Sequence, residues 1–427
     1  MLRPSCRACL VVGSLVMINL AIWGCGNHNQ PPSSSGHADA APVRSAKART
    51  LIAEVGTKVF SLGPHGESPT APEHVTLSDT ELTRIRAKHA TAAIVLHYGG
   101  NDWSNAQVAG LKAQFDHMGI QVIAVTDAGF KPEKQVSDLE TVMAKKPNII
   151  VSIPTDPSAT AGTYKKAADQ GVKLVFMDNV PKGLIAGKDY VSAVSADNYG
   201  NGVVAATLMG EALGGKGKIG VIYHAADFFV TRERYDAFKK TIMNAFPDIH
   251  IVEEQAIGGP DFSGDAERAA SAMLTSHRDL DGIWAVWDVP AEGVIAAART
   301  AGRDKLVVTT CDLGENVAID MARRGFVKGL GAQRPFDQGV IEAQLAGYSL
   351  LGKKSPVYVA VPAVAVTHDN LLDAWRTVYH EDAPADIRDN MNRNLQGRTY
   401  PLLVWPILRA TEARARVTSA IQQTITP

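Results

Sequence analysis

Polar and aromatic side chains gather where the predicted strands of this 427-residue chain end. The positions are Asn101, Trp103, Asp178, Trp287, Asp288, Asp312 and Gln333, with Arg234 on a predicted helix. Carboxylates, amides and a guanidinium pair with hydroxyl groups, and indole faces pack on C–H groups. Taken singly, each residue has a structural alternative, since strand-end aspartates often cap helices and tryptophans often fill cores. Taken together, they predict a polar ligand held at the strand ends.

The first of these ends organises the chain. An apolar run from Ala92 to Leu96 has the length of a buried strand, and apolar residues recur at helical spacing from Val108 onward. Asn101 lies between the two patterns and is a good N-cap. Ligands of parallel α/β sheets bind beyond the carboxyl ends of the strands, so Asn101 and Trp103 are candidates for one wall of a ligand site. The alternative is that Trp103 belongs to the core.

Strand and helix patterns alternate after this unit, which predicts right-handed crossovers and parallel sheets. Further strands are predicted at 120–126, 148–154, 173–178, 191–196, 218–224, 249–257, 282–288 and 305–312. Helices are predicted at 136–146, 158–171, 231–246, 264–277, 290–302 and 315–325, and a capping box at Ser78 and Glu81 predicts one from Asp79 to Ala87. So many units exceed one sheet of normal width and indicate two lobes.

Composition excludes several classes of function. A formal net charge of −1 leaves no basic stripe for nucleic acid. We find no zinc-ligand cluster, and we expect neither a metal nor a cofactor. The glycine patterns at 200–205 and 215–220 lack the strand context of a dinucleotide site, and no P-loop or hydrolase elbow occurs.

The first 25 residues have the pattern of an export signal, with Arg3 and Arg7 before an apolar run that is short for a membrane span. The run ends in a segment that resembles a bacterial lipoprotein box, which implies that Cys25 is lipidated. Trp23 departs from the small residues of such boxes, and an ordinary cleaved signal or an uncleaved anchor is the alternative. Residues 26–50 are small and polar, which predicts a flexible linker. Cys6 and Cys9 would be removed with the signal, and Cys25 would carry the lipid. Cys311 would then be the one free cysteine of the mature chain, so no disulfide is expected.

From about Ala92 to Thr367, the chain resembles the type I periplasmic sugar-binding proteins of the ribose-binding group, which serve ATP-driven importers. The segments that carry the resemblance are 148–156, 173–178, 194–198, 234–238 and 333–335, in this order. The resemblance implies an α/β fold of two Rossmann-like lobes with parallel sheets, joined by a three-stranded hinge. It also implies the division into lobe one, residues 91–196 with 334–362, and lobe two, residues 197–333 with 363–381. The 51–90 extension and the 382–427 tail lie outside it, and neither receives a functional account.

Carried over residue by residue, the sugar contacts of the family fall on Asn101, Trp103, Asp178, Arg234, Phe262, Asp312 and Gln333. Three positions depart from ribose binders. Ser104 replaces an aromatic residue, Asn179 replaces an arginine, and Trp287 replaces an asparagine. These departures argue against ribose itself and suggest an aromatic sandwich of Trp103 and Trp287. The loss of a cation beside Asp178, Asp288 and Asp312 also admits an aminated sugar or polyol.

The sequence thus predicts an exported, lipid-anchored and monomeric receptor of the periplasm or cell envelope. It would capture a monosaccharide or related polyol and deliver it to the permease of an ABC importer, without catalysis. The main alternative is a receptor of the same fold that signals to a sensor kinase or chemoreceptor. The effector domain of a transcription regulator is disfavoured by the export signal and by the lack of a helix-turn-helix before Ala92.

Overall fold

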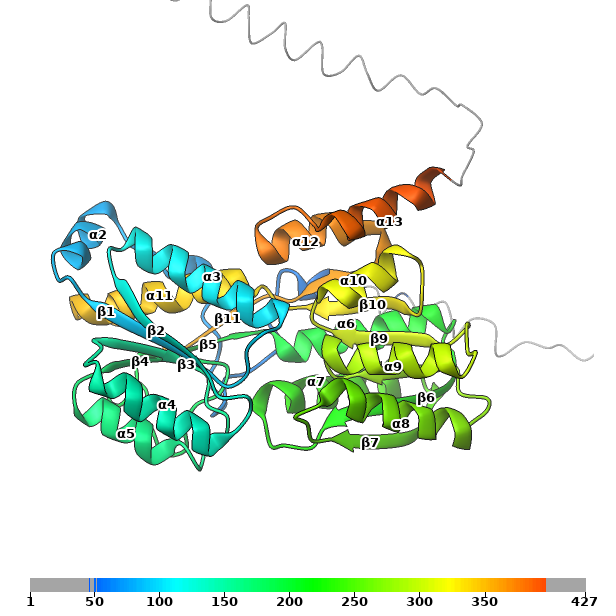
Figure 1. Ribbon diagram of the computed structural model, residues 1–427. Helices are drawn as coiled ribbons and strands as arrows, with labels where there is room; N and C mark the ends of the chain where they lie inside the picture. Colours follow the sequence, from blue (N-terminus) through cyan, green and yellow to red (C-terminus); the bar gives the residue numbers. More distant parts are fainter. Residues whose placement is uncertain (1–45, 47–49, 51, 397–427) are drawn as a thin grey trace, which may run out of the picture.

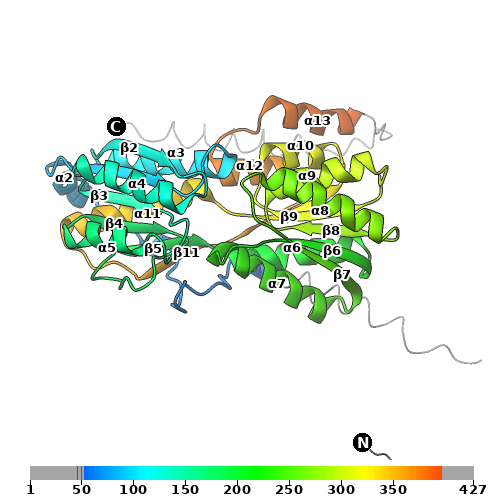
Figure 2. The ribbon, with the colours of Figure 1, turned by 60° about the horizontal axis from the view of Figure 1, so that its bottom comes forward.

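The computed structural model describes residues 46, 50 and 52–396. The predicted export signal, Cys25, most of the linker and the end of the tail lie outside these residues. Figure 1 shows two α/β lobes side by side, and Figure 2 shows the segments that connect them. Among the described residues, no helix combines the length and the apolar character that a membrane crossing requires.

Lobe one is built on a six-stranded sheet with the order β11-β5-β4-β3-β1-β2, in which all neighbours are parallel. Its strands are β1 (Thr91–Leu96), β2 (Gln121–Asp127), β3 (Ile149–Ser152), β4 (Lys173–Met177), β5 (Ser192–Ala196) and β11 (Tyr358–Val361). Its helices are α2 (Asp79–Arg86), α3 (Asp102–His117), α4 (Pro132–Ala144), α5 (Ala161–Asp169) and α11 (Pro335–Leu351).

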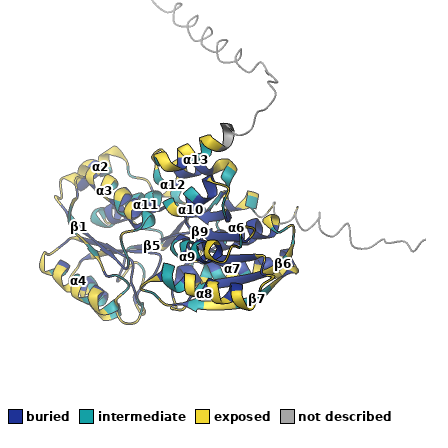
Figure 3. Ribbon diagram, turned by 45° about the vertical axis from the view of Figure 1, so that its right-hand side comes forward, coloured by how far each residue is buried: buried dark blue, intermediate teal, exposed yellow. Residues whose placement is uncertain are grey.

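Strand β1 shows why a continuous apolar run was needed. Ile94 packs toward Phe115 of α3, whereas Ala93 and Val95 pack toward Leu139 of α4 on the opposite face. A parallel strand covered by helices on both faces has no polar side, so its sequence does not alternate. Figure 3 shows the same pattern for the inner strands of both sheets, which are buried between helices whose outer faces are exposed, whereas the edge strands β2 and β7 are partly exposed.

Lobe two repeats the arrangement with the order β12-β10-β9-β8-β6-β7. Its strands are β6 (Lys216–His224), β7 (Asp248–Ile257), β8 (Gly282–Ala285), β9 (Val307–Cys311), β10 (Val327–Ala332) and β12 (Val364–Val366), and only β12 runs antiparallel to its neighbour. Its helices are α6 (Asn198–Ala212), α7 (Phe229–Ala245), α8 (Phe262–Ser276), α9 (Asp288–Thr300), α10 (Glu315–Ala322), α12 (Leu371–Tyr379) and α13 (Ala385–Gln396).

The chain passes between the lobes after β5, after β10 and between β11 and β12. The predicted α/β fold of two lobes with parallel-dominated sheets is therefore confirmed. Most boundaries lie within a few residues of those predicted. Helix α5 begins at Ala161 rather than Ser158, because the Asp156 carboxylate accepts hydrogen bonds from the amides of Ser158 and Ala159 and holds a turn there. Strand β8 ends at Ala285 and α9 already begins at Asp288, so the predicted strand was too long.

Residues 52–78, here called the N-terminal strap, run across the first crossing between the lobes. Val55 is fully buried against Val203 and Val204 of α6 in lobe two. The amides of Phe60 and Ser61 each donate to the Asp197 carboxylate at 2.9 Å. The strap therefore holds the residue at which the chain leaves lobe one and begins α6.

Farther along, the strap binds lobe one. The Thr70 amide donates to the Tyr358 carbonyl at 2.9 Å, beside β11, and a short 3-10 helix follows at Pro72–His74. The Thr76 amide donates to the Tyr348 hydroxyl of α11 at 2.8 Å. The predicted capping box at Ser78 is present and starts α2, which confirms that helix.

The end of the described chain covers lobe two. After a 3-10 turn at His368–Asn370, α12 buries Trp375 and Val378 in the lobe-two core. Helix α13 lies on α10 and buries Ile387 in the same core (Figure 1). The first part of the predicted tail is thus packed as a helix against lobe two.

Candidate functional site

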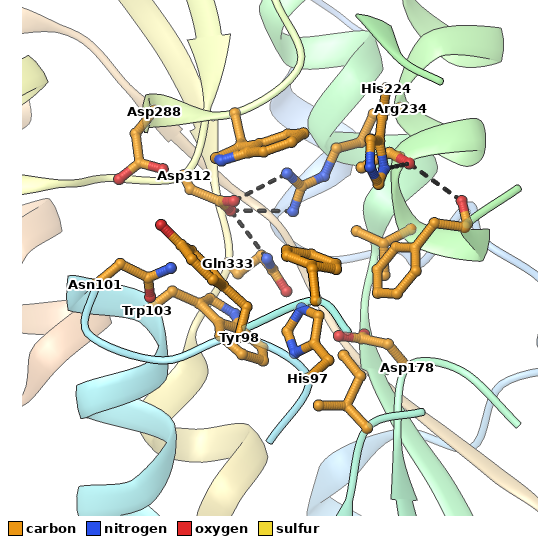
Figure 4. A pocket seen from close by; sticks show the side chains of 16 residues that line it. His97, Tyr98, Asn101, Trp103, Asp178, His224, Arg234, Asp288, Asp312 and Gln333 are labelled. Carbon is orange, nitrogen blue, oxygen red and sulfur yellow. Dashed lines mark hydrogen bonds and ion pairs between the residues drawn. The ribbon is translucent and has the colours of Figure 1, made fainter. Parts of the chain in front are cut away.

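A cavity lies between the lobes at the carboxyl ends of strands from both sheets (Figure 4). The volume of the cavity that the centre of a water molecule can reach is about 60 Å³. One water needs roughly 10–15 Å³ of such space, so a monosaccharide requires the lobes to part or side chains to move. The lobes touch beside it, since the Glu315 amide of α10 donates to the Asp102 carboxylate of α3 at 2.7 Å.

Eight of the eleven residues predicted from the sequence line this cavity. They are Asn101, Trp103, Asp178, Arg234, Trp287, Asp288, Asp312 and Gln333. They come from both lobes, and residues as far apart in sequence as Asn101 and Gln333 meet there. The three others, Ser104, Asn179 and Phe262, do not line it.

Each of these three residues supports the lining. The Ser104 amide donates to the Asn101 side chain at 2.8 Å in a capping box that starts α3, so Asn101 is the N-cap that was predicted. The Asn179 amide group donates to the Pro154 carbonyl at 3.2 Å. Phe262 packs on Trp287, with ring centroids 4.9 Å apart.

In lobe two, the centre of the site is a buried ion pair. The Arg234 guanidinium donates to both carboxylate oxygens of Asp312, at 2.9 and 3.0 Å, and to the Asn198 side chain at 3.0 Å. The Gln333 amide group donates to the same carboxylate at 2.9 Å (Figure 4). Arg234 is 1% exposed, and this bidentate geometry is what makes so buried a guanidinium tolerable.

In lobe one, Asp178 is equally buried but has weaker partners. The Ser195 hydroxyl donates to its carboxylate at 2.5 Å, and no cation of the described chain forms an ion pair with it. Burial raises the pKa of Asp178 from its usual value to about 6. Burial also raises the pKa of Asp288 well above its usual value, and the carboxylates of Asp312, Glu292 and Asp102 act in the same direction.

Aromatic rings from the two lobes interlock beside these carboxylates. His97 of lobe one stacks on Phe228 of lobe two with centroids 5.4 Å apart and planes 13° apart. Phe130 contacts Phe228 at 6.0 Å and Phe262 at 5.4 Å across the cleft. Trp103 packs edge-on against His97, 5.9 Å away. The cleft is thus lined by apolar faces with a few carboxylates and amides between them.

Sequence reasoning missed eight lining residues. They are His97, Tyr98, Phe130, Ile153, His224, Phe228, Val230 and Thr231. His97 directly follows β1 and His224 ends β6, so the strand-end rule that selected Asp178 would have found both. Burial lowers the pKa of His97 to about 3 and that of His224 to about 4, so both imidazoles are neutral.

No group of three or more potential metal ligands occurs in the described part of the chain. The lobe-two histidine, His224, contacts the Thr231 hydroxyl at 3.3 Å, and Cys311 is buried beside Asp312. The site therefore offers hydrogen-bond acceptors and ring faces, which suit the reversible binding of a polar molecule.

Comparison with known proteins agrees with this geometry. A model of the periplasmic binding protein domain matches residues 92–354, more than half of the chain. The ribose import binding protein of Salmonella typhimurium is 25% identical over 284 residues, which cover 66% of this chain and 91% of that protein. The D-ribose/D-allose-binding protein of Pseudomonas aeruginosa is 28% identical over 271 residues, which cover 61% and 77%.

Solved structures show the same fold. An ABC transporter solute-binding protein from Agrobacterium vitis, bound with α-D-tagatopyranose, superposes with a TM-score of 0.63 and 25% identity and covers 68% of this chain and all of its own. The arabinose-binding protein of Geobacillus stearothermophilus gives 0.58 and 24%, over 66% of this chain and 98% of its own.

These relatives are binding proteins and not enzymes, which confirms the prediction of a receptor without catalytic activity. The resemblance to the type I sugar-binding group is confirmed as well, and the family is one of periplasmic proteins. The chain belongs to the periplasmic binding protein family.

Proposed function

We propose that this protein captures a monosaccharide or a related polyol between its lobes and delivers it to the permease of an ABC importer. The observation that carries the proposal is the cavity at the facing strand ends, where buried carboxylates and amides lie among aromatic faces. Such a lining matches a ring that has hydroxyl groups at its rim and C–H groups on its faces. Relatives named for the import of ribose and apiose, and one named for the binding of ribose and allose, support the same class of ligand.

Individual roles follow from the contacts. The carboxylates of Asp178 and Asp288 accept hydrogen bonds from ligand hydroxyls, and the Asn101 amide adds a further polar contact. Trp103 and Trp287 line the cavity from different lobes and pack on the ring faces. Arg234 and Gln333 hold Asp312 in place, and Ser104, Asn179 and Phe262 support the lining residues from behind.

Ligand capture would involve closure of the cleft. The three connections between the lobes can act as a hinge, and the Asp102 to Glu315 hydrogen bond and the His97 to Phe228 stack form only when the lobes meet. A ligand that bridges the lobes favours this state because it adds contacts that the open state lacks.

A thermal-shift screen of pentoses, hexoses and polyols at neutral pH, followed by calorimetry, tests the binding function. A ligand that binds only the folded protein raises the melting temperature by mass action. We expect at least one member of the panel to do so in wild type and to do so less in Trp103→Ala. If no carbohydrate or polyol shifts the melting temperature, the proposed function is wrong.

Delivery is tested separately in cells. Deletion of the gene should abolish uptake of the radiolabelled ligand, and re-expression should restore it. Unchanged uptake in the deletion strain, with a lost transcriptional or chemotactic response, would instead support the signalling receptor.

We further propose that Cys25 carries the lipid anchor. Wild-type protein should fractionate with membranes, and Cys25→Ser should be released, since a multiply acylated cysteine holds stably. Retention of the variant in the membrane fraction would indicate an uncleaved apolar helix.

A further inference from the structure

The charge of the cleft is not balanced by its own residues. Four formally charged side chains line the cavity, the carboxylates of Asp178, Asp288 and Asp312 and the guanidinium of Arg234. Three negative charges and one positive charge leave a net charge of −2. All four residues are at most 8% exposed, so solvent compensates little of this charge.

The one cation is already used within the protein. Arg234 donates from Nη1 and Nη2 to Asp312, from Nε to Asn198, and from Nη1 also to the Val286 carbonyl at 3.2 Å. Asp178 and Asp288 form no ion pair with any described residue. When ionised, the carboxylates without a counter-charge are therefore these two, one from each lobe.

The histidines of the cleft do not supply the missing charge. His97 and His224 line the same cavity, and burial keeps both imidazoles neutral. Nδ1 of His97 is buried and has no hydrogen-bond partner in the described part of the chain, and the residue is 7% exposed. Such an atom is rare in a folded protein and indicates a polar group that only a ligand or a water molecule can satisfy.

The remaining walls are π-electron faces. Tyr98, Phe130, Phe228 and Trp287 line the cavity beside the carboxylates. Aromatic faces attract cations through the ring quadrupole, most strongly where water is excluded. Carboxylates set among aromatic rings therefore favour the binding of an ammonium group.

We infer that the ligand of this cleft is a carbohydrate or polyol that carries a protonated amine, and that Asp178 and Asp288 select for that amine. This inference rests on the proposed function and specifies its ligand. An ammonium group would donate to a carboxylate by a charge-assisted hydrogen bond, while the ring hydroxyls bind the remaining acceptors.

Matched ligand pairs test the inference. The pairs are D-glucosamine with D-glucose, D-galactosamine with D-galactose, and D-glucamine with D-glucitol, and N-acetyl-D-glucosamine is the uncharged control. Calorimetry should give an affinity about tenfold or more higher for the amine of the pair that binds, which corresponds to about 1.4 kcal/mol. N-acetylation should remove this advantage.

Two substitutions locate the effect. In Asp288→Asn and in Asp178→Asn, the ratio of amine affinity to neutral affinity should fall toward one, because the amide keeps the shape and loses the charge. Asp236→Asn is the matched control. Asp236 is exposed on α7 and lies outside the cavity lining. Its substitution changes the net charge of the protein by the same amount and should leave the ratio of amine affinity to neutral affinity unchanged. Two independent variants keep the test valid if one of them fails to fold.

The outcomes separate the inference from the proposed function. Neutral sugars that bind as tightly as their amines, or a ratio that neither aspartate variant changes, would overturn the inference and leave sugar binding intact. If neither member of any pair binds, and the wider carbohydrate panel also fails, the proposed function is overturned.

Discussion

The two lobes offer the cleft the same residue type at the same place, in different surroundings. Asp178 follows β4 and Asp312 follows β9, and each of these strands lies third in its sheet. Both aspartates have left-handed backbone, with φ of 52° and 65°. Aspartate and asparagine adopt this region more readily than most residues, so the strand ends of the two lobes turn in the same way.

The partners differ. Asp312 accepts hydrogen bonds from Arg234 and Gln333, whereas Asp178 accepts from the Ser195 hydroxyl and the Ala196 amide and forms an ion pair with no described cation. Lobe two thus satisfies its aspartate internally, before any ligand arrives. Lobe one leaves its aspartate with acceptor capacity to spare. The comparison teaches that the equivalent strand end supplies a preformed platform in lobe two and an acceptor for what enters the cleft in lobe one.

The largest effect should come from breaking the platform. We expect Asp312→Asn to lower the free energy of unfolding by about 3 kcal/mol or more, because it leaves the buried guanidinium of Arg234 without its counter-charge. Urea denaturation at pH 7 measures this. The double variant Arg234→Met/Asp312→Asn should recover much of the loss, since it removes both charges and keeps a residue suited to left-handed backbone at position 312. A loss below about 1 kcal/mol in the single variant would show that the pair does not hold lobe two together.

The two tryptophans should differ in how much each contributes to folding stability. Trp287 is 9% exposed and belongs to the lobe-two core, so Trp287→Ala should cost about 3 kcal/mol of folding free energy. Trp103 is only partly buried, so Trp103→Ala should cost about 1 kcal/mol. Both should weaken ligand binding. Equal losses of stability would contradict the different burial of the two rings, and denaturation with calorimetry on the same samples decides the question.

Acid should destabilise the protein through His97, which directly follows β1, and His224, which ends β6. The pKa values of His97 and His224 lie below 6.5 in the folded state, at about 3 and about 4. The unfolded chain therefore binds more protons between about pH 4 and 6.5, and stability falls as the pH drops through this window. Each histidine should contribute a loss of about 2 kcal/mol at pH 5.

Asp178 acts in the opposite direction between about pH 4 and 6, because its folded-state pKa is raised. His97→Gln and His224→Gln should each reduce the acid loss relative to wild type, as followed by denaturation at pH 7 and pH 5. An unchanged pH slope in both variants would mean that the imidazoles are solvated.

The smallest effect on stability should come from Asp178, the aspartate without an ion pair to a described residue. Asp178→Asn keeps a residue suited to left-handed backbone and removes a charge that burial disfavours. We expect the free energy of unfolding at pH 7 to change by less than about 1 kcal/mol, since the Ser195 hydroxyl can still donate to the amide oxygen. A loss as large as that of Asp312→Asn would end the distinction between the two lobes.

Much of the fold was readable from local patterns. The apolar run at β1, the Asn101 cap and the Ser78 capping box each specify an element through neighbouring residues, and each is present. The polar strand ends were readable for the same reason, because an aspartate that follows an apolar run stands out. The different roles of Asp178 and Asp312 could not be predicted from the sequence. They depend on Arg234, which contacts Asp312 from a helix that is distant in the sequence.

The aromatic half of the site could not be separated from core by its sequence. Phe130 and Phe228 lie in loops, and a phenyl ring has the same pattern whether it faces a core or a cleft. Only the approach of the two lobes brings these rings to 6.0 Å from each other. The packing of the N-terminal strap could not be predicted either, because its partners are distant in sequence.

That distance orders the folding of the chain. Ser61 is separated from Asp197 by 136 residues, and Thr76 from the Tyr348 hydroxyl by 272. The strap is synthesised before either lobe, yet the part that binds lobe one has its partners only after α11 and β11 have formed. Loops of this length close late, so docking of the strap should be among the last steps of folding. Contacts formed after the transition state slow unfolding without speeding folding. Docking of the N-terminal strap should therefore lower the unfolding rate of the folded protein.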